Sequence, residues 1–498
     1  MIAERRPPER YVSEADVRGH VPVHVVWEVT LACNLKCHHC GSRAGKARPD
    51  ELSTEEALGV VRELAALGTR EITLIGGEAF MRRDWLQIIR AIRDHGMAPT
   101  MQSGGYRLTA KRIREAAEAG LVGAGVSIDG PREVHDAIRG VRGSYDDALA
   151  ALDAIRDNGL VASVNTQISK PVIPHLRQLQ EVFIAHQARN WQVQLTVAMG
   201  RAADNPDLLL QPYDLLEVMP LLAELYHVGE VRGLLLQAGN NVGYYGPYEH
   251  LWRGSGDGRA HYAGCMAGQT TIGIEADGTI KGCPSLPTNP YAGGNIRDIP
   301  LADIWRAADN PMAFTRERGT EDLWGFCAGC YYAEICRGGC NWTSHSLLGE
   351  RGNNPYCHHR ALELAGHGLR ERVVQVQSAP GCSFDHGRFD LVLEPMDAVT
   401  ETIDVMALAR RANGVPVDGD AAPAEVRYPA PYAGPRPALK RRTPPLLVLC
   451  RGCSRFVGPD EEICPFCDAR LTEAEATYRA RLDRARRASE RLAELIGA

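Results

Sequence analysis

Three cysteines near the N-terminus have the spacing of a reactive metal centre. Cys33, Cys37 and Cys40 follow directly after an apolar run that predicts a β-strand. Cysteine thiolates bind iron–sulfur clusters, and a cubane held entirely by protein takes four of them. Three thiolates therefore leave one iron open, as a catalytic centre requires. The alternative is a structural site that takes its fourth ligand from a distant part of the chain.

A larger group of cysteines lies further along the chain, which has fifteen cysteines in all. Seven of them stand at Cys265, Cys283, Cys327, Cys330, Cys336, Cys340 and Cys357. Clustered cysteines in a cytosolic chain favour metal binding over disulfides. A cluster that binds only zinc is the alternative, and the spacing disfavours it. Cys382 stands alone and is given no role.

A third group forms two knuckles near the C-terminus, Cys450-x-x-Cys453 and Cys464-x-x-Cys467. Two such pairs predict a tetrahedral four-cysteine site of the zinc-ribbon or rubredoxin type. Zinc is favoured, because closed sites of this kind usually hold a small module together, and a redox iron site is the alternative. The module either docks a partner peptide or serves only as a folding staple.

The elements that position the first triad alternate between strand and helix patterns. The predicted strands are Val23–Val29, Glu71–Ile75, Ala98–Gln102, Gly123–Ile128, Val161–Ile168 and Trp191–Val197. The predicted helices are Thr54–Leu67, Arg83–His95, Ala110–Ala119, Asp146–Asn158 and His175–His186. The first helix opens on a capping box formed by Ser53 and Glu56. Six such units in series imply an α/β fold with a parallel sheet curved into a partial (β/α)6 barrel.

Residues that suit a polar ligand follow these strands at their carboxyl ends, where sites gather in parallel α/β folds. They are Gly76, Gly77 and Glu78, then Ser103, Gly104 and Gly105, Ser127 and Asp129, Gln167 or Ser169, and Arg201. The glycines would let backbone approach a ligand, and the polar groups suit a small zwitterion that carries a ribose. Each alone is as readily a turn or a cap, but their alignment with the triad favours function.

The first triad resembles the signature of the radical S-adenosylmethionine (SAM) family, and reads Cys33-Asn34-Leu35-Lys36-Cys37-His38-His39-Cys40. The family's GGE element, which contacts the methionine amine, is matched by Gly76-Gly77-Glu78. A segment that usually meets ribose or carboxylate is matched by Ser127 and Asp129, and a Gly-Arg element by Arg201. The resemblance implies reductive cleavage of SAM to a 5′-deoxyadenosyl radical that abstracts a substrate hydrogen, while the protein positions the reactants and excludes water.

The seven central cysteines resemble the SPASM extension, which holds two auxiliary [4Fe–4S] clusters in addition to the SAM-binding one. By that resemblance the outer cluster is held by Cys327, Cys330, Cys336 and Cys357, and the inner cluster by Cys265, Cys283 and Cys340. No cysteine stands a few residues before Cys265, so the inner cluster either keeps an open iron or takes His261 as its fourth ligand. An auxiliary cluster near the substrate could accept the electron that leaves when a new bond forms.

The resemblance implies peptide maturation, with a ribosomally synthesised precursor peptide as substrate and a cross-link, an epimerised residue or an excision as product. It extends to maturases that act on GDL-motif peptides. Only about twenty residues precede the first strand, so we expect no N-terminal winged-helix module for a leader peptide. Leader binding would then fall to a separate protein, to the span 375–440, or to the knuckles themselves. An electron donor such as flavodoxin or ferredoxin is also implied.

Two other functions remain open. One is a small-molecule radical SAM enzyme, for instance one that modifies a tetrapyrrole side chain, as some SPASM proteins do. The other is a non-enzymatic protein that binds iron–sulfur clusters and zinc, which the polar residues around the triad disfavour. Binding of a short peptide or of a porphyrin would separate the first two functions.

The charge and the hydropathy of the chain restrict the kinds of partner that it can bind. The net charge is −6 and the sequence pI is about 6.3, so nothing in the electrostatics points to nucleic acid. No apolar stretch reaches the roughly 18 residues of a membrane span, and no signal peptide is apparent, so we expect a cytoplasmic protein without a membrane partner.

The chain is expected to divide into five parts. These are an N-terminal extension (1–20), the radical SAM partial barrel (21–235), the SPASM auxiliary-cluster domain (236–370), a linker or poorly ordered region (371–444), and the zinc-ribbon-like knuckles with a C-terminal helix (445–498).

Overall fold

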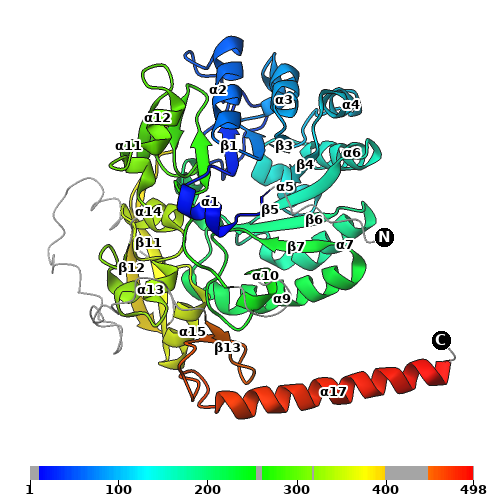
Figure 1. Ribbon diagram of the computed structural model, residues 1–498, viewed down its shortest axis with the longest axis vertical. Coiled ribbons are helices and arrows are strands. Elements are labelled where there is room, and N and C mark those ends of the chain that lie inside the picture. Colours follow the sequence, from blue (N-terminus) through cyan, green and yellow to red (C-terminus); the bar gives the residue numbers. More distant parts are fainter. Residues whose placement is uncertain (1–9, 254–260, 317–318, 399–446, 497–498) are drawn as a thin grey trace.

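The computed structural model describes residues 10–253, 261–316, 319–398 and 447–496. Its centre is one curved sheet of ten strands, with helices on its outer face (Figure 1). The strand order is β10-β9-β8-β1-β2-β3-β4-β5-β6-β7, and all pairs from β8 to β7 are parallel. The strands are β1 His24–Glu28, β2 Glu71–Ile75, β3 Ala98–Ser103, β4 Gly123–Ser127, β5 Val161–Ile168, β6 Asn190–Leu195, β7 Leu235–Ala238, β8 Thr271–Ile274, β9 Thr279–Lys281 and β10 Ala292–Asn295.

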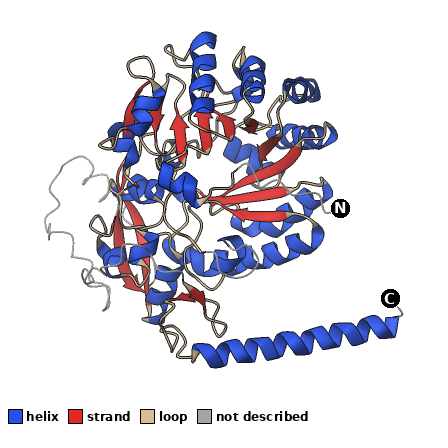
Figure 2. Ribbon diagram, viewed as in Figure 1, coloured by secondary structure: helices blue, strands red, loops and turns tan. Residues whose placement is uncertain are grey.

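Helices cover the barrel and build most of the region that follows it (Figure 2). Around the barrel they are α1 Glu14–Gly19, α2 Thr54–Ala66, α3 Trp85–Asp94, α4 Ala110–Ala119, α5 Arg132–Arg139, α6 Ser144–Asp157, α7 Leu176–Ala185, α8 Arg201–Asp204, α9 Leu215–Arg232 and α10 Glu249–Arg253. Beyond it they are α11 Thr288–Tyr291, α12 Leu301–Arg306, α13 Ala333–Cys336, α14 Asn341–Leu348, α15 His358–Gly366 and α17 Leu471–Ile496. None of the helices in the described ranges is both long and apolar enough to cross a membrane.

The predicted alternation of strands and helices is confirmed. The capping box at the start of α2 forms as expected, because the Ser53 side chain accepts from the Glu56 N–H while Glu56 accepts from the Ser53 N–H. The buried faces of the strands and helices form one continuous core that includes Val25, Trp27 and Ile72. The sequence patterns missed α9, which contains Pro220 and carries the apolar residues Val228 and Val231 on its exposed side, so that its apolar periodicity is weak.

The cysteine-rich region extends the barrel sheet. Strand β8 pairs with β1 in parallel, from His24 opposite Thr271 to Trp27 opposite Ile274. Strands β9 and β10 then continue the sheet in antiparallel pairs. This continuation was not predicted, because strands of three or four residues among glycines and cysteines carry no clear alternation.

The region expected to be a linker over 371–444 begins with regular structure. Strands β11 Leu369–Gln377 and β12 Arg388–Pro395 form an antiparallel hairpin. Their alternation supports one buried side, with Val373 and Phe389 in the core. Residues 399–446 lie outside the described residues. After them, β13 Val448–Leu449 and β14 Phe456–Val457 pair within the C-terminal knuckles, and α17 projects from the body (Figure 1).

Candidate active site and metal centres

The loop that carries the first cysteine triad follows β1. The thiols of Cys33 and Cys40 each accept a backbone N–H from within the loop at 3.4 Å. The Arg139 guanidinium approaches the Cys37 sulfur at 3.7 Å. Burial, reinforced by the nearby Glu78 charge, raises the pKa of Cys33 to about 12, so a bound cation is needed to hold this group as a thiolate. A metal cluster therefore fits the loop better than a free reactive thiol does.

Arg201 holds the same loop from the far side of the barrel. Its Nε donates to the Cys37 carbonyl at 2.6 Å, and its terminal nitrogens donate to the Ala44 carbonyl at 3.2 and 3.3 Å. Its backbone N–H donates to the Cys40 carbonyl at 3.0 Å. The guanidinium thus bonds the loop that carries the cysteines, and orients that loop.

Gly76 and Gly77 let the segment after β2 cross beneath the cysteine loop. The N–H of Gly77 donates to the Thr30 carbonyl and that of Glu78 to the Ala32 carbonyl, each at 2.8 Å. A Cβ on Gly76 would lie 2.2 Å from the Thr30 oxygen, and one on Gly77 would lie 2.3 Å from the Ala32 oxygen. Only glycine fits this approach, which places Glu78 beside the triad.

Glu78 is a buried carboxylate that faces neutral donors. The Ser103 hydroxyl donates to one of its oxygens, and the Gly104 N–H donates to the other at 2.6 Å. Burial raises the pKa of Glu78 to about 7, against these hydrogen bonds. A carboxylate of this kind would be stabilised by a cationic ligand group, so the site fits the ammonium of a bound amino acid.

Asp129 lies deeper, behind His39. One of its oxygens accepts from His39 Nε2 at 2.8 Å and from the Arg139 guanidinium, and the other accepts the Gln167 N–H at 2.8 Å. Although burial opposes it, Arg139 and His39 hold the pKa of Asp129 well below its usual range. All the bonds that Asp129 makes here are to protein groups, so it orients His39, whose Nδ1 makes no hydrogen bond to any described residue.

A cavity of about 200 Å³ occupies the mouth of the barrel beside the triad. It is lined by Glu28, His39, Gly41, Ser42, Ile75, Gly76, Gln167, Gln194, Val197, Met199, Ile274, Glu275, Pro284, Ser285, Trp342 and Phe384. The first ten of these come from the barrel and the others from the cysteine-rich region and the loop before β12. Both halves of the protein therefore build the wall of this cavity.

The cavity wall carries two carboxyl groups, Glu28 and Glu275, and one imidazole, His39. Arg48 lies behind the wall and bonds Glu28 at 3.2 Å and Glu275 at 2.9 Å, and Lys281 bonds Glu275 at 2.7 Å. Burial raises the pKa of Glu28 to about 7 although Arg48 opposes the shift. Among the described residues that line the cavity, none is a lysine or an arginine.

Cys283, one of the three predicted inner-cluster ligands, directly precedes two residues that line this cavity. Burial and the charges of Cys265 and Cys340 raise the pKa of Cys283 to about 12, which reflects how closely the three thiols approach one another. Residues Pro284 and Ser285, which follow Cys283, line the cavity itself. Cys283 is therefore placed next to the space where a ligand would sit, and Cys265 and Cys340 are near enough to Cys283 to interact with its charge.

The other four central cysteines line a second, much smaller cavity, of about 20 Å³. Its walls include all four predicted outer-cluster ligands, which are Cys327, Cys330, Cys336 and Cys357. Arg360 is buried beside Cys357 and forms an ion pair with Glu371 at 2.5 Å. Four thiols converging on one enclosed space fit a fully ligated iron–sulfur cluster.

His261 does not face the inner cysteines. Its Nε2 lies 3.4 Å from the Leu447 N–H, and its Nδ1 lies 3.1 Å from the Tyr262 carbonyl. Its ring lies edge-on to Phe456, at 5.3 Å between centroids. Both ring nitrogens are engaged with backbone groups, so His261 is a poor candidate for the fourth ligand of the inner cluster.

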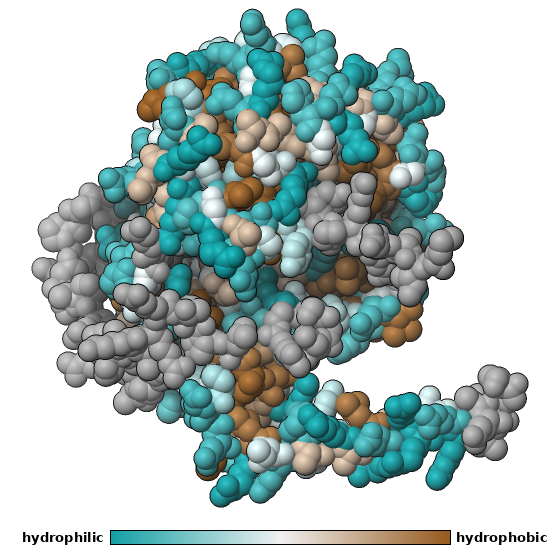
Figure 3. Space-filling model, in the orientation of Figure 1, coloured by the Kyte–Doolittle hydropathy of each residue, from teal (hydrophilic) through white to brown (hydrophobic). Residues whose placement is uncertain are grey.

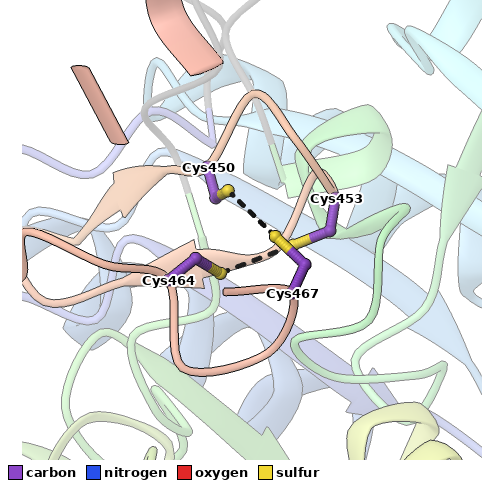
Figure 4. A group of neighbouring side chains, drawn as sticks. All are labelled: Cys450, Cys453, Cys464 and Cys467. Carbon is purple, nitrogen blue, oxygen red and sulfur yellow. Dashed lines mark hydrogen bonds between the residues drawn. The ribbon is translucent and has the colours of Figure 1, made fainter. Parts of the chain in front are cut away.

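The C-terminal cysteines form a compact four-thiol group (Figure 4). Cys450 and Cys467 lie 3.8 Å apart between sulfurs, and Cys453 and Cys464 lie 3.6 Å apart. A tetrahedral ion with bonds of about 2.3 Å to sulfur would separate its ligands by about 3.8 Å. The four thiols therefore fit a single metal ion. Within the described ranges no other three cysteines lie this close together, and an iron–sulfur cluster needs the wider spacing.

Two family models match the chain. The model of the radical SAM superfamily matches residues 27–169, and the SPASM model, described as an iron–sulfur cluster-binding domain, matches residues 265–331. The chain therefore contains a radical SAM domain over residues 27–169 and a SPASM iron–sulfur cluster-binding domain over residues 265–331. These two domains imply SAM and iron–sulfur clusters as cofactors.

Related proteins and structures divide between two kinds of substrate. The AdoMet-dependent heme synthase of Nitratidesulfovibrio vulgaris is 27% identical over 68% of this chain and 93% of that protein. Mycofactocin maturase MftC of Mycolicibacterium smegmatis is 27% identical over 67% of this chain and 82% of that protein. The structure of Streptococcus suis SuiB bound to S-adenosylmethionine aligns with a TM-score of 0.52 and 18% identity over 69% of this chain and 78% of SuiB, which shows a shared fold.

The radical SAM core brings several predicted site residues to one place. Glu78 and Ser103 adjoin the triad, and Gly76 and Gln167 line the cavity. Ser127 and Ser169 also stand at the ends of their strands, but they are not among the residues that line it. His39, Arg139 and Glu28 were missed by the sequence reasoning. His39 was identifiable, since it lies inside the cysteine motif, whereas the other two become neighbours of the site only through folding.

Proposed function

We propose that this protein cleaves SAM reductively and modifies a ribosomally synthesised peptide. In the proposal Cys33, Cys37 and Cys40 hold the SAM-binding [4Fe–4S] cluster. With SAM bound, that cluster supplies a 5′-deoxyadenosyl radical that abstracts a substrate hydrogen. Two auxiliary [4Fe–4S] clusters, held by the seven SPASM cysteines, bring the total to three. The four C-terminal cysteines are proposed to hold zinc.

The residues around the triad are proposed to place SAM. Glu78 would receive its ammonium group, supported by Ser103, while Gly76 and Gly77 let backbone approach it. Ser127 and Asp129 were expected to meet the ribose or the carboxylate. Because the Asp129 oxygens are already bonded to protein, we propose that it acts by orienting His39, and that Arg201 acts by orienting the cysteine loop.

The observation that carries the choice of a peptide is the charge of the cavity wall. Tetrapyrroles carry carboxylate side chains, but no lysine or arginine stands among the described lining residues, and the nearby Arg48 and Lys281 are already paired with Glu28 and Glu275. A peptide offers amide groups that Gln167 and Gln194, on the opposite wall, can bond. MftC and SuiB, which the chain resembles, are by name a maturase and a protein that binds a precursor peptide.

A tetrapyrrole substrate is the second candidate. It is favoured by the heme synthases, which are 27% and 28% identical to this chain over 68% and 67% of its length. The two candidates make different demands on the cavity. A porphyrin needs cationic partners for its carboxylates, whereas a peptide can be held by hydrogen bonds.

The further partners follow from this chemistry. Reduction of the SAM-binding cluster requires an electron donor such as flavodoxin or ferredoxin. A separate protein would bind the leader of the precursor peptide. We propose a cytoplasmic location, where such donors are reduced.

The test is anaerobic co-expression with each short peptide encoded beside the gene, followed by mass spectrometry of the peptide. A loss of two hydrogens that requires Cys37, with 5′-deoxyadenosine formed in equal amount, is the expected result for a cross-link. Deuterium uptake from D₂O would indicate epimerisation, and a larger loss excision. An unchanged peptide, together with 5′-deoxyadenosine formation when an iron porphyrin is supplied, would overturn the peptide assignment in favour of the second candidate.

A further inference from the structure

The C-terminal module, residues 447–470, is seated directly on the outer-cluster cavity. Tyr331 and Tyr332 follow Cys330 in the chain. The Tyr332 hydroxyl donates to the Phe456 carbonyl at 2.6 Å, and the Tyr331 hydroxyl accepts the Gly458 N–H at 2.9 Å. The apolar core of the SPASM domain is continuous with the module here, since Phe456 packs in the same buried cluster as Tyr332.

A second set of contacts reaches the last outer-cluster ligand. Arg455 is mostly buried and donates to Glu363 at 3.0 Å and to His359 Nδ1 at 3.2 Å. His359 stands two residues after Cys357, at the start of α15, and lines the outer cavity. The module therefore contacts the outer-cluster motif at two places, directly after Cys330 and shortly after Cys357.

One layer of aromatic rings separates the two metal sites. Phe466 stands between Cys464 and Cys467 in the chain. Its ring is stacked on Tyr332 at 5.8 Å between centroids, and it lies edge-on to His359 at 5.7 Å. Tyr332 and His359 both belong to the wall of the outer cavity. The knuckle that holds the metal is therefore also the outer cover of that wall.

The module is too small to keep this position by itself. It contains two strands of two residues each, and its own buried cluster consists of Cys450, Val457 and Cys464. A core of this size does not support a fold, so metal binding must supply the missing stability. The surface view shows apolar residues gathered where the body narrows toward the C-terminal helix (Figure 3).

We propose that the C-terminal module is a metal-dependent cover for the outer auxiliary cluster. With its four cysteines loaded, the module holds Arg455, Phe456 and Phe466 against the cluster wall and excludes solvent and oxygen from the cluster. Without the metal, Tyr332 and His359 are exposed and the cluster is lost sooner. The inference rests on the proposed outer cluster, but not on the identity of the substrate.

Hydrogen exchange of the full-length, anaerobically reconstituted protein tests the cover. A Cys464→Ser substitution should abolish zinc binding and speed amide exchange in residues 326–336 and 356–364 at least about tenfold, while β2 exchanges as before. Arg455→Ala removes the hydrogen bonds to Glu363 and His359 but no metal ligand. It should speed amide exchange in the same residues while zinc stays bound. The control is Cys382→Ser, which removes an exposed thiol outside all three cysteine groups. Unchanged exchange in either test variant would overturn the proposal.

Loss of iron in air tests the protective role separately. In the Cys464→Ser and Arg455→Ala proteins, about four iron atoms per chain should be lost several-fold faster than from wild type, because one [4Fe–4S] cluster is uncovered. Equal rates in wild type and variants would overturn the protective role. A protein that fails to modify any peptide leaves both measurements interpretable, so failure of the inference and failure of the proposed function can be told apart.

Discussion

Arg139 and Asp129 form a fully buried ion pair beside the cysteine triad. Removing one partner of such a pair costs about 3–5 kcal/mol, because the other charge stays buried without compensation. Arg139→Met should therefore lower the thermal unfolding midpoint markedly. It should also weaken iron binding at the triad, since Arg139 donates toward the Cys37 sulfur. Calorimetry and iron analysis of the anaerobic protein measure both effects.

The matched control lies at the other end of the same helix. Arg132 pairs with Asp146, but both side chains are about half exposed, and such pairs contribute about 0–1 kcal/mol. Arg132→Met should leave the unfolding midpoint and the iron content close to wild type. Equal effects of the two substitutions would contradict the role given to the buried pair.

Because the Glu28 carboxyl is buried, we expect the free energy of unfolding to fall as the pH rises. Its pKa is raised from 4.5 to about 7 in the fold, so its contribution is fully present below pH 4.5, where both states are protonated. Between pH 4.5 and 7 the unfolded chain gains by ionising, and about 3 kcal/mol of stability is lost. Glu28→Gln should remove this loss and flatten the unfolding midpoint between pH 5 and 8. Glu55→Gln, at an exposed position, should follow the wild-type curve, and a Glu28→Gln curve that also follows it would contradict the argument.

For single residues, the sequence predicted which side chains lie at the site better than it predicted their hydrogen-bond partners. Strand ends and cysteine spacing were enough to bring Glu78 and Ser103 to the triad. They could not show that Asp129 is covered by His39 and Arg139, or that Arg201 bonds loop carbonyls. Those partners are up to 164 residues away in the chain, and only the curvature of the sheet brings them together.

Among the elements, the two loops after β1 and β2 cross so closely that an added side-chain atom has no room. A Cβ on Gly77 would lie 2.3 Å from the Ala32 oxygen and 2.7 Å from the Cys33 Cβ. Gly77→Ala must therefore displace the cysteine loop, at a cost of about 1–3 kcal/mol, and iron bound at the triad should fall. Gly45→Ala is the control, because Gly45 lies in the same loop and a Cβ there meets nothing within 4 Å. Iron content and the electron paramagnetic resonance signal of the reduced protein report the outcome, and equal iron content in the two variants would contradict it.

The elements that the sequence predicted are those with regular periods. Helix α4 and strands β2 and β5 have the predicted bounds, because their apolar residues recur at helical or strand intervals in the sequence. The hairpin β11–β12 was assigned to a linker because the composition of the residues around it, rich in Ala, Pro and Gly, outweighed the alternation of nine residues. Strand β8 was missed because its four residues form a strand only against the edge of β1.

At the scale of the whole molecule, the radical SAM core and the SPASM domain share one sheet and one cavity. The wall around the ligand site takes Gln167 and Gln194 from the barrel and Ser285 and Trp342 from the SPASM domain. Cys283, one of the predicted inner-cluster ligands, follows β9 and is therefore placed next to the cavity by the strands that continue the sheet from the edge of β1. Folding of the second domain is therefore a condition for a complete first site.

This dependence predicts how a shortened chain behaves. A protein that ends at Arg253 lacks β8, so the edge of β1 from His24 to Trp27 loses its backbone partners. An unpaired central strand is a template for association, and we expect most of this protein to be aggregated on size-exclusion chromatography. A protein that ends at Asp397 keeps β8 to β12 and should elute as a folded species with the far-ultraviolet circular dichroism of the barrel. If the shorter chain were equally soluble and folded, β1 would not depend on β8, and the barrel would have to be regarded as an independent domain.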